Sequence, residues 1–367
     1  MRGLYVHVPF CLKKCDYCDF VSYTDCFSRE EEYVSALLSE FGQYRGTKVD
    51  TVYVGGGTPT SLQTKSLVRI LDGAFAAFDV AEDAEITVEC NPKTADLEKF
   101  TALKHAGVNR LSIGVQSLDD TILKTIGRIH SAQDATDCVK MAYSAGFSNI
   151  SGDLMFGLPG QSMESLERSI DGMLKLPFTH ISCYGLILED ATPLAEKVRA
   201  GAYTLPDEDT EYAMYCNINE TLKANGFSRY EISNFAKDGF FSRHNVKYWD
   251  CIEYIGCGAG AHSYFEGIRY CHTEDVSAYI QNPAERQDVI HIDSEDAMRE
   301  FMMLGLRKTE GVSKTEFQNR FGKTISDCFG EIIKTYKEKG LLSETEDRIF
   351  FTEQGIYVSN MVLCEFA

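Results

Sequence analysis

The sequence lacks a long apolar run, a secretory signal and any surplus of positive charge. No stretch approaches the ~20 apolar residues that a membrane-spanning helix needs. The opening residues, MRGLYVHVPFC, contain neither an apolar signal core nor a small-residue cleavage site, so we expect a cytoplasmic protein. The net charge of −19 disfavours general binding to nucleic acid or to anionic membrane surfaces.

The sequence also lacks paired CxxC motifs, although it contains 13 cysteines. The odd number and the missing signal predict free thiols in a reducing compartment. Most cysteines lie alone in apolar segments, as small buried residues do. Only Cys11, Cys15 and Cys18 cluster, within the stretch CLKKCDYCDF. Three thiolates are one fewer than a closed tetrahedral metal site requires.

Three interpretations of this cluster are possible. A structural zinc ion would need a fourth ligand, which His7 or Asp19 is placed in the sequence to supply. The thiols could also remain without a metal, although such tight spacing disfavours this. A [4Fe–4S] cluster held by only three cysteines leaves one iron open to a ligand that is not protein. We favour the third interpretation.

Apolar strand patterns alternate with helical patterns over the first 225 residues. Each of three helix ends is followed by a glycine, at Gly107, Gly146 and Gly226, where a left-handed C-cap is expected. The alternation predicts an α/β fold with parallel βα units, built as a whole or partial (β/α) TIM-like barrel. The predicted strands cover residues 4–9, 50–56, 85–90, 110–116, 150–157 and 180–188, and the predicted helices cover 28–44, 64–78, 95–106, 119–126, 132–145, 163–176 and 207–225.

Polar residues follow five successive predicted strands. The three cysteines follow the first strand, and the run from Gly55 to Thr58 follows the second. Glu89, Gln116 and Asp153 stand at or near the ends of the next three. Because the carboxyl ends of barrel strands meet at one rim, we expect these groups to form the active site there.

The alternation of predicted strands and helices ends at about residue 282. Asn282-Pro283 and the polar run behind it suggest a linker before a helix that begins at Ser294. A capping box at Ser313 and Glu316, a helix ending near Gly340 and a strand pair in RIFFTEQG (348–355) suggest a winged-helix-like domain. Residues 294–367 hold 10 Lys and Arg against 13 Asp and Glu, which favours protein packing over DNA binding. We expect a barrel core in 1–240, an extension in 241–285 and this domain in 286–367.

The motif CxxxCxxC, with Tyr17 before its last cysteine and GGGTP at 55–59, resembles the radical S-adenosylmethionine (SAM) superfamily. The resemblance implies that Cys11, Cys15 and Cys18 hold a [4Fe–4S] cluster whose open iron binds the methionine part of SAM. The glycine run would donate N–H groups to a carboxylate, and the acidic residues would bind amino and ribose groups. The positions that match the family's SAM site are Tyr5, Tyr17, Gly56, Gly57, Thr58, Glu89, Gln116, Arg128 and Asp153.

Segments along nearly the whole chain, among them LYVHVPFC, VECNP, DLMFGLPGQ and HNVKYW, resemble the oxygen-independent coproporphyrinogen III oxidase-like group. That group contains a dehydrogenase of haem synthesis, which converts propionates of coproporphyrinogen III to vinyl groups, and the HemW haem chaperones. The dehydrogenase has a further cysteine where this chain has Phe20, and a long extension where only ten residues precede Cys11. Both differences favour the chaperone, and the dehydrogenase remains the alternative.

The segment HNVKYW (244–249) matches the HNxxYW motif associated with HemW. The resemblance implies haem contact through His244, Asn245, Tyr248 and Trp249. The alternative is a packed turn in which these residues bond to backbone and fill core. We expect haem as cargo and respiratory or other haem-receiving proteins as clients. Membrane contact would then run through those clients, and a homodimer is left open.

Overall fold

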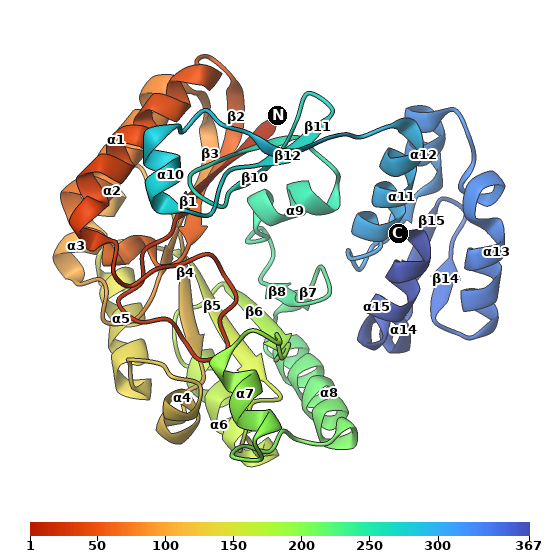
Figure 1. Cartoon of the computed structure of the whole chain (residues 1–367). Helices are drawn as coiled ribbons and strands as arrows, with labels where there is room; N and C mark the ends of the chain where they lie inside the picture. Colours follow the sequence, from red (N-terminus) through yellow and green to blue (C-terminus); the bar gives the residue numbers. More distant parts are fainter.

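Figure 1 shows the computed structural model, which describes all residues from 1 to 367. A curved sheet with helices on its outer face forms the larger unit, and a smaller, mostly helical unit lies beside it. The two are joined by the chain that leads from β12 to α11. No helix of the structure is long and apolar enough to cross a membrane.

The larger unit is built on one twelve-stranded sheet in the order β12-β11-β10-β9-β1-β2-β3-β4-β5-β6-β8-β7. The consecutive strands from β9 through β1 to β6 pair in parallel. β12 and β7 are the two edge strands of this sheet and do not pair with each other, so the barrel is not closed. The bounds are β1 Arg2–Val8, β2 Lys48–Gly56, β3 Asp79–Cys90, β4 Arg110–Gln116, β5 Asn149–Phe156, β6 His180–Gly185, β7 Ser228–Arg229, β8 Asn234–Ala236, β9 Tyr254–Cys257, β10 His262–Phe265, β11 Ile268–Cys271 and β12 Gln287–His291.

Side-chain alternation along the strands separates the barrel interior from the core. In β4, Leu111, Ile113 and Val115 join the apolar core between sheet and helices, whereas Ser112 and Gln116 line a central pocket. The surrounding helices are α1 Glu30–Phe41, α2 Thr64–Ala77, α3 Leu97–His105, α4 Asp120–Thr125, α5 Ala132–Ser144, α6 Met163–Leu174, α7 Pro193–Arg199, α8 Glu208–Ala224, α9 Arg243–Trp249 and α10 Val276–Gln281. All six predicted strands and all seven predicted helices of this unit are confirmed.

The expected linker after Asn282 is wrong in part. Residues 287–291 form β12, which pairs antiparallel with β11, so the first sheet extends beyond the boundary expected at 286. All five residues of β12 are exposed. An exposed edge strand shows no alternation of buried and exposed positions, and so its sequence gives no strand signal.

The smaller unit has its own apolar core, in which Met302, Phe317 and Phe366 are fully buried. Its elements are α11 Ser294–Gly305, β13 Val312–Ser313, α12 Lys314–Phe321, α13 Ile325–Glu338, β14 Leu342–Glu344, β15 Arg348–Phe351, α14 Glu353–Tyr357 and α15 Ser359–Leu363. Its three strands pair in the order β13-β15-β14. The strand predicted over 348–355 ends early, because Thr352 accepts a hydrogen bond from Gly355 N and caps α14.

Candidate functional site

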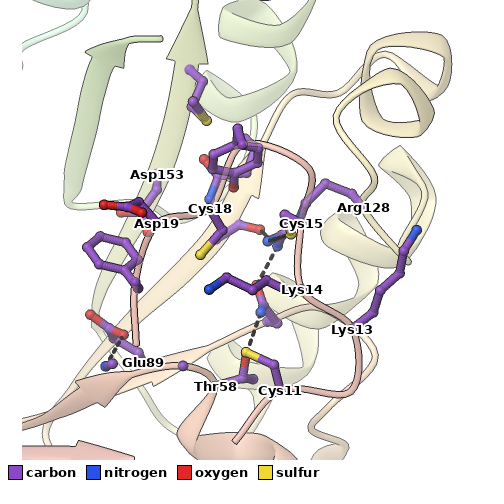
Figure 2. Close-up of a pocket in the computed structure, with 18 of the residues that line it drawn as sticks. Cys11, Lys13, Lys14, Cys15, Cys18, Asp19, Thr58, Glu89, Arg128 and Asp153 are labelled. Carbon is purple, nitrogen blue, oxygen red and sulfur yellow. Dashed lines mark hydrogen bonds between the residues drawn. The ribbon is translucent and has the colours of Figure 1, made fainter. Parts of the chain in front are cut away.

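A cavity of about 500 Å³ opens at the carboxyl ends of the parallel strands. Figure 2 shows the cysteine loop on one side of it and the acidic residues Glu89 and Asp153 on the other. The structure therefore brings together eleven of the residues predicted to form the cluster and SAM sites, namely Cys11, Cys15, Tyr17, Cys18, Gly56, Gly57, Thr58, Glu89, Gln116, Arg128 and Asp153. Tyr5 lies outside the lining residues, where its hydroxyl contacts His7 Nδ1 at 3.0 Å.

The three clustered thiols lie on the loop between β1 and α1. Backbone bonds fix this loop, from Cys11 N to Tyr23 O (3.0 Å) and from Cys18 N to Cys15 O (3.1 Å). All 13 cysteines of the chain are free. Burial raises the pKa of the Cys11 and Cys18 thiols, so metal binding there would be coupled to proton release.

These three thiols do not form a preassembled site for a single metal ion. No three His, Cys, Asp or Glu side chains gather closely enough to hold one metal ion, which would require sulfurs about 3.8 Å apart. His7 does not face the thiols, because its Nε2 contacts Val21 O at 2.8 Å and its Nδ1 contacts Tyr5. A [4Fe–4S] cluster binds its thiolates on separate irons and so accepts a wider spacing.

A chain of hydrogen bonds joins two of these thiols. Cys11 Sγ lies 3.3 Å from Thr58 Oγ1, which accepts a bond from Asn91 Nδ2 at 2.7 Å. Asn91 Oδ1 accepts from Arg128 Nη2, and Arg128 Nη1 donates to Cys15 Sγ at 3.4 Å. Asn91 was not predicted as a site residue, although it stands two residues after Glu89 in VECNP. The chain fixes the orientation of Arg128 at the cysteine loop.

The N–H groups of the glycine run bond to protein groups. Gly57 N donates to Val8 O (2.9 Å), Thr58 N to Phe10 O (2.8 Å) and Gly56 N to Glu89 Oε2 (3.1 Å). In this structure all three N–H groups therefore have protein acceptors, and contact between the glycine run and a ligand carboxylate stays a prediction. A Cβ on Gly57 would lie 2.8 Å from Phe10 O, so glycine allows the end of β2 to pack directly on the cysteine loop.

Two partly buried carboxyl groups, those of Glu89 and Asp153, line the wall opposite the thiols. Glu89 accepts from Tyr53 OH at 2.8 Å, and burial raises the pKa of Glu89 to about 7. Burial likewise raises the pKa of Asp153 to about 6, and Ser112 Oγ lies 3.4 Å from its Oδ1. A cationic group that enters the cavity would stabilise both carboxylates in their charged form. This donor set fits a ligand with an ammonium group.

The predicted site residue Gln116 contacts a second lining residue, Tyr184, that sequence patterns did not single out. Gln116 has a φ of +64°, unusual for a side chain other than glycine, and its Oε1 accepts from Tyr184 OH at 3.1 Å. Tyr184 lies in β6 and lines the same cavity. Its sequence context, HISCYG, is an apolar strand, and only the curvature of the sheet brings it to this pocket.

The HNVKYW segment lies apart from this cavity, as helix α9 between the two units (Figure 1). His244 is 1% exposed, with Nδ1 at 2.8 Å from Thr51 Oγ1 and Nε2 at 2.9 Å from Tyr248 OH. Burial lowers the pKa of His244 to about 3, so its imidazole is neutral. Asn245 N contacts the cap Ser242 Oγ at 3.4 Å.

The same helix connects the barrel to the C-terminal unit. The Trp249 ring is covered by the Arg307 guanidinium at 4.5 Å, and Lys308 pairs with Asp250. On its other side, His244 stacks on Tyr53, with ring centroids 5.2 Å apart. Both ring nitrogens of His244 are thus engaged by protein groups, and haem contact at this motif stays a prediction.

Comparison with known proteins agrees with this architecture. The profile of the Radical SAM superfamily matches residues 5–172, and the profile of the HemN C-terminal domain matches residues 292–358. A protein of Bacillus subtilis named heme chaperone HemW is 40% identical and aligns with 100% of this chain and 99% of its own length. The chain belongs to the HemW family of the radical SAM superfamily.

Other HemW proteins extend the match. The heme chaperone HemW of Lactococcus lactis is 38% identical, with 100% of this chain and 97% of its own length aligned. The solved structure of coproporphyrinogen III oxidase (HemN) from Escherichia coli covers 99% of this chain and 89% of its own, with a TM-score of 0.88. At 22% identity, that likeness shows the shared fold. The partial barrel and the helical C-terminal unit are therefore features of both proteins.

Proposed function

We propose that this protein binds haem and transfers it to haem-receiving proteins. The observation that supports this proposal is the match over the full length to proteins named heme chaperone HemW, at 40% and 38% identity. We place the protein in the cytoplasm, with respiratory enzymes as clients. With a net charge of −19, it would reach membrane-bound clients through a specific contact, for which the C-terminal unit is available.

We also propose that the cavity holds a [4Fe–4S] cluster and SAM. Cys11, Cys15 and Cys18 would ligate three irons, and the fourth would bind SAM. Glu89 is suited to the amino group of SAM, because its partly buried carboxyl group lines the cavity opposite the thiols. Asp153 and Gln116 would bind the ribose side, and Arg128 would support the cysteine loop through its bond to Cys15.

The alternative function is that of a coproporphyrinogen III dehydrogenase. A complete cysteine and carboxylate constellation favours it, because a simple carrier has no evident need of radical chemistry. Phe20 argues against it, since the position where the dehydrogenase has a further cysteine holds an aromatic side chain here, 69% exposed. No thiol is available at that point of the cavity.

One experiment separates the two functions. The cluster is reconstituted anaerobically, and one sample receives coproporphyrinogen III, SAM and a strong reductant, with products analysed by mass spectrometry. A second sample is titrated with haem and followed by its Soret band, with albumin as the non-specific control. We expect saturable haem binding without vinyl products. Vinyl products together with 5′-deoxyadenosine, or haem affinity no greater than that of albumin, would overturn the proposal.

A further inference from the structure

The mouth of the cavity exposes an unusual number of large apolar side chains. Phe20 and Ile187, which line the cavity itself, are 69% and 70% exposed. Leu12 and Ile129, which line a smaller adjoining hollow, are 53% and 38% exposed. We call these four residues the apolar rim. These four are one third of the twelve large hydrophobic residues that are exposed in the whole chain. Such a concentration marks a surface that another apolar body covers.

The charges at the mouth are separated by position. Lys13 and Lys14 are exposed on the cysteine loop and line the cavity, in a chain with 55 acidic and 36 basic residues. Asp19 and Glu189 also line it. In Figure 2, Asp19 lies beside Asp153, whereas Lys13 lies on the opposite side beside Arg128. Lys13 lines the same small hollow as Leu12 and Ile129, so the mouth has a basic side next to apolar side chains, which suits an apolar molecule with carboxylate groups at one edge.

No histidine lines this cavity or the smaller hollow beside it. His7 is bonded through both ring nitrogens, and His244 lies apart in α9 with both of its nitrogens engaged. His130 is 4% exposed, with Nε2 at 3.1 Å from Val115 O and with Nδ1 enclosed without a partner, so neither nitrogen reaches the mouth. A haem at the mouth would thus be held by its ring and its carboxylates. Such a haem can leave without breaking an iron–histidine bond, which suits a protein that must release its cargo.

We infer that the apolar rim, together with Lys13 and Lys14, is the docking site for haem. The macrocycle lies against Phe20 and Ile187, and its propionates pair with the two lysines. This inference rests on the proposed haem-carrier function and names the surface that performs it. It places haem at the opening of the cavity, directly above the cysteine loop, and it assigns His244 a structural position in α9.

The test uses the full-length protein with its cluster reconstituted, titrated with haem and with metal-free protoporphyrin IX. The rim variant combines Phe20→Ser with Ile187→Ser, and the charge variant combines Lys13→Glu with Lys14→Glu. The matched control combines Val289→Ser with Ile290→Ser, which removes two apolar residues of similar exposure from β12. All six positions are on the surface, so folding is preserved.

We expect the Kd values of wild-type protein for haem and for metal-free protoporphyrin IX to agree within about threefold, because the haem iron contributes little to the affinity. The rim variant should lose about tenfold or more in affinity for both. The charge variant should lose about three- to tenfold, and less in high salt. The control should bind as wild type. The inference is overturned if rim and charge variants keep wild-type affinity, or if the metal-free porphyrin does not bind while haem does. If wild-type protein binds neither porphyrin, the proposed function itself fails.

Discussion

Replacing Glu89 by glutamine tests whether the carboxylate of Glu89 binds the amino group of SAM. Glu89 is held by Tyr53 OH at 2.8 Å and by Gly56 N at 3.1 Å, and burial raises its pKa to about 7. Glutamine keeps the size of the side chain and removes its charge. If Glu89 binds the ammonium group of SAM, losing that charge should cost about 2 kcal/mol of binding free energy, or about thirtyfold in Kd.

The pH dependence of SAM binding should change as well. A cationic ligand favours the ionised carboxylate, so affinity falls as pH drops below the pKa of each free carboxyl group. With pKa values of about 7 for Glu89 and about 6 for Asp153, affinity should fall about twentyfold between pH 8 and pH 6. In Glu89→Gln only the contribution of Asp153 remains, which is about twofold.

The assay is equilibrium dialysis of labelled SAM against cluster-loaded protein at pH 6, 7 and 8. Glu231→Gln is the matched control, because Glu231 is 1% exposed, burial raises its pKa too, and it lies outside the cavity. The control should keep the affinity and the pH dependence of wild type. If Glu89→Gln retains the twentyfold change, or if wild type shows none, Glu89 does not bind the cationic group.

Two further predictions concern the cluster and a distant ion pair. Cys15→Ala and Cys18→Ala should each reduce bound iron after reconstitution to near zero, whereas exposed Cys364→Ala should keep the wild-type iron content; a loaded cluster in either loop variant would refute the ligand assignment. Buried His272 has its Nε2 2.8 Å from Glu40 Oε1; burial alone would lower its pKa, but Glu40 raises it above 6.5. A raised histidine pKa gives stability that is complete below pH 6.5 and is lost as pH rises through the folded-state value. The melting temperature of wild type should therefore fall more between pH 6 and pH 9 than that of His272→Gln, and equal slopes would contradict the assignment.

The sequence was sufficient for the barrel and for most of its rim, for identifiable physical reasons. Each buried parallel strand is an apolar run, and the glycines expected at helix C-caps, Gly107, Gly146 and Gly226, all have the left-handed φ. Residues that directly follow such strands can only lie at the carboxyl-end rim. The cysteines, which follow β1, lie at the rim by that rule, whereas Glu89 and Asp153 line the same cavity from within β3 and β5.

Features that depend on contacts between distant segments were not predictable in this way. The partners of the glycine N–H groups depend on how closely β2 packs on the cysteine loop, and Asn91 joins the site only through Thr58 and Arg128. The burial of His244 depends on Thr51 and Tyr53 in β2, against which its side of α9 packs. A local motif does not show which of its side chains the rest of the chain will enclose.

Transfer of haem to an acceptor is the step that a haem chaperone must perform, and it is measured as follows. Haem-loaded protein is mixed with the haem-free form of a respiratory enzyme, and the Soret spectrum and the activity of that enzyme are followed together. We expect haem to leave this protein and the acceptor to gain activity in proportion, faster than with haem-loaded albumin. An acceptor that stays inactive, or that gains haem no faster than it does from albumin, would contradict the proposed function.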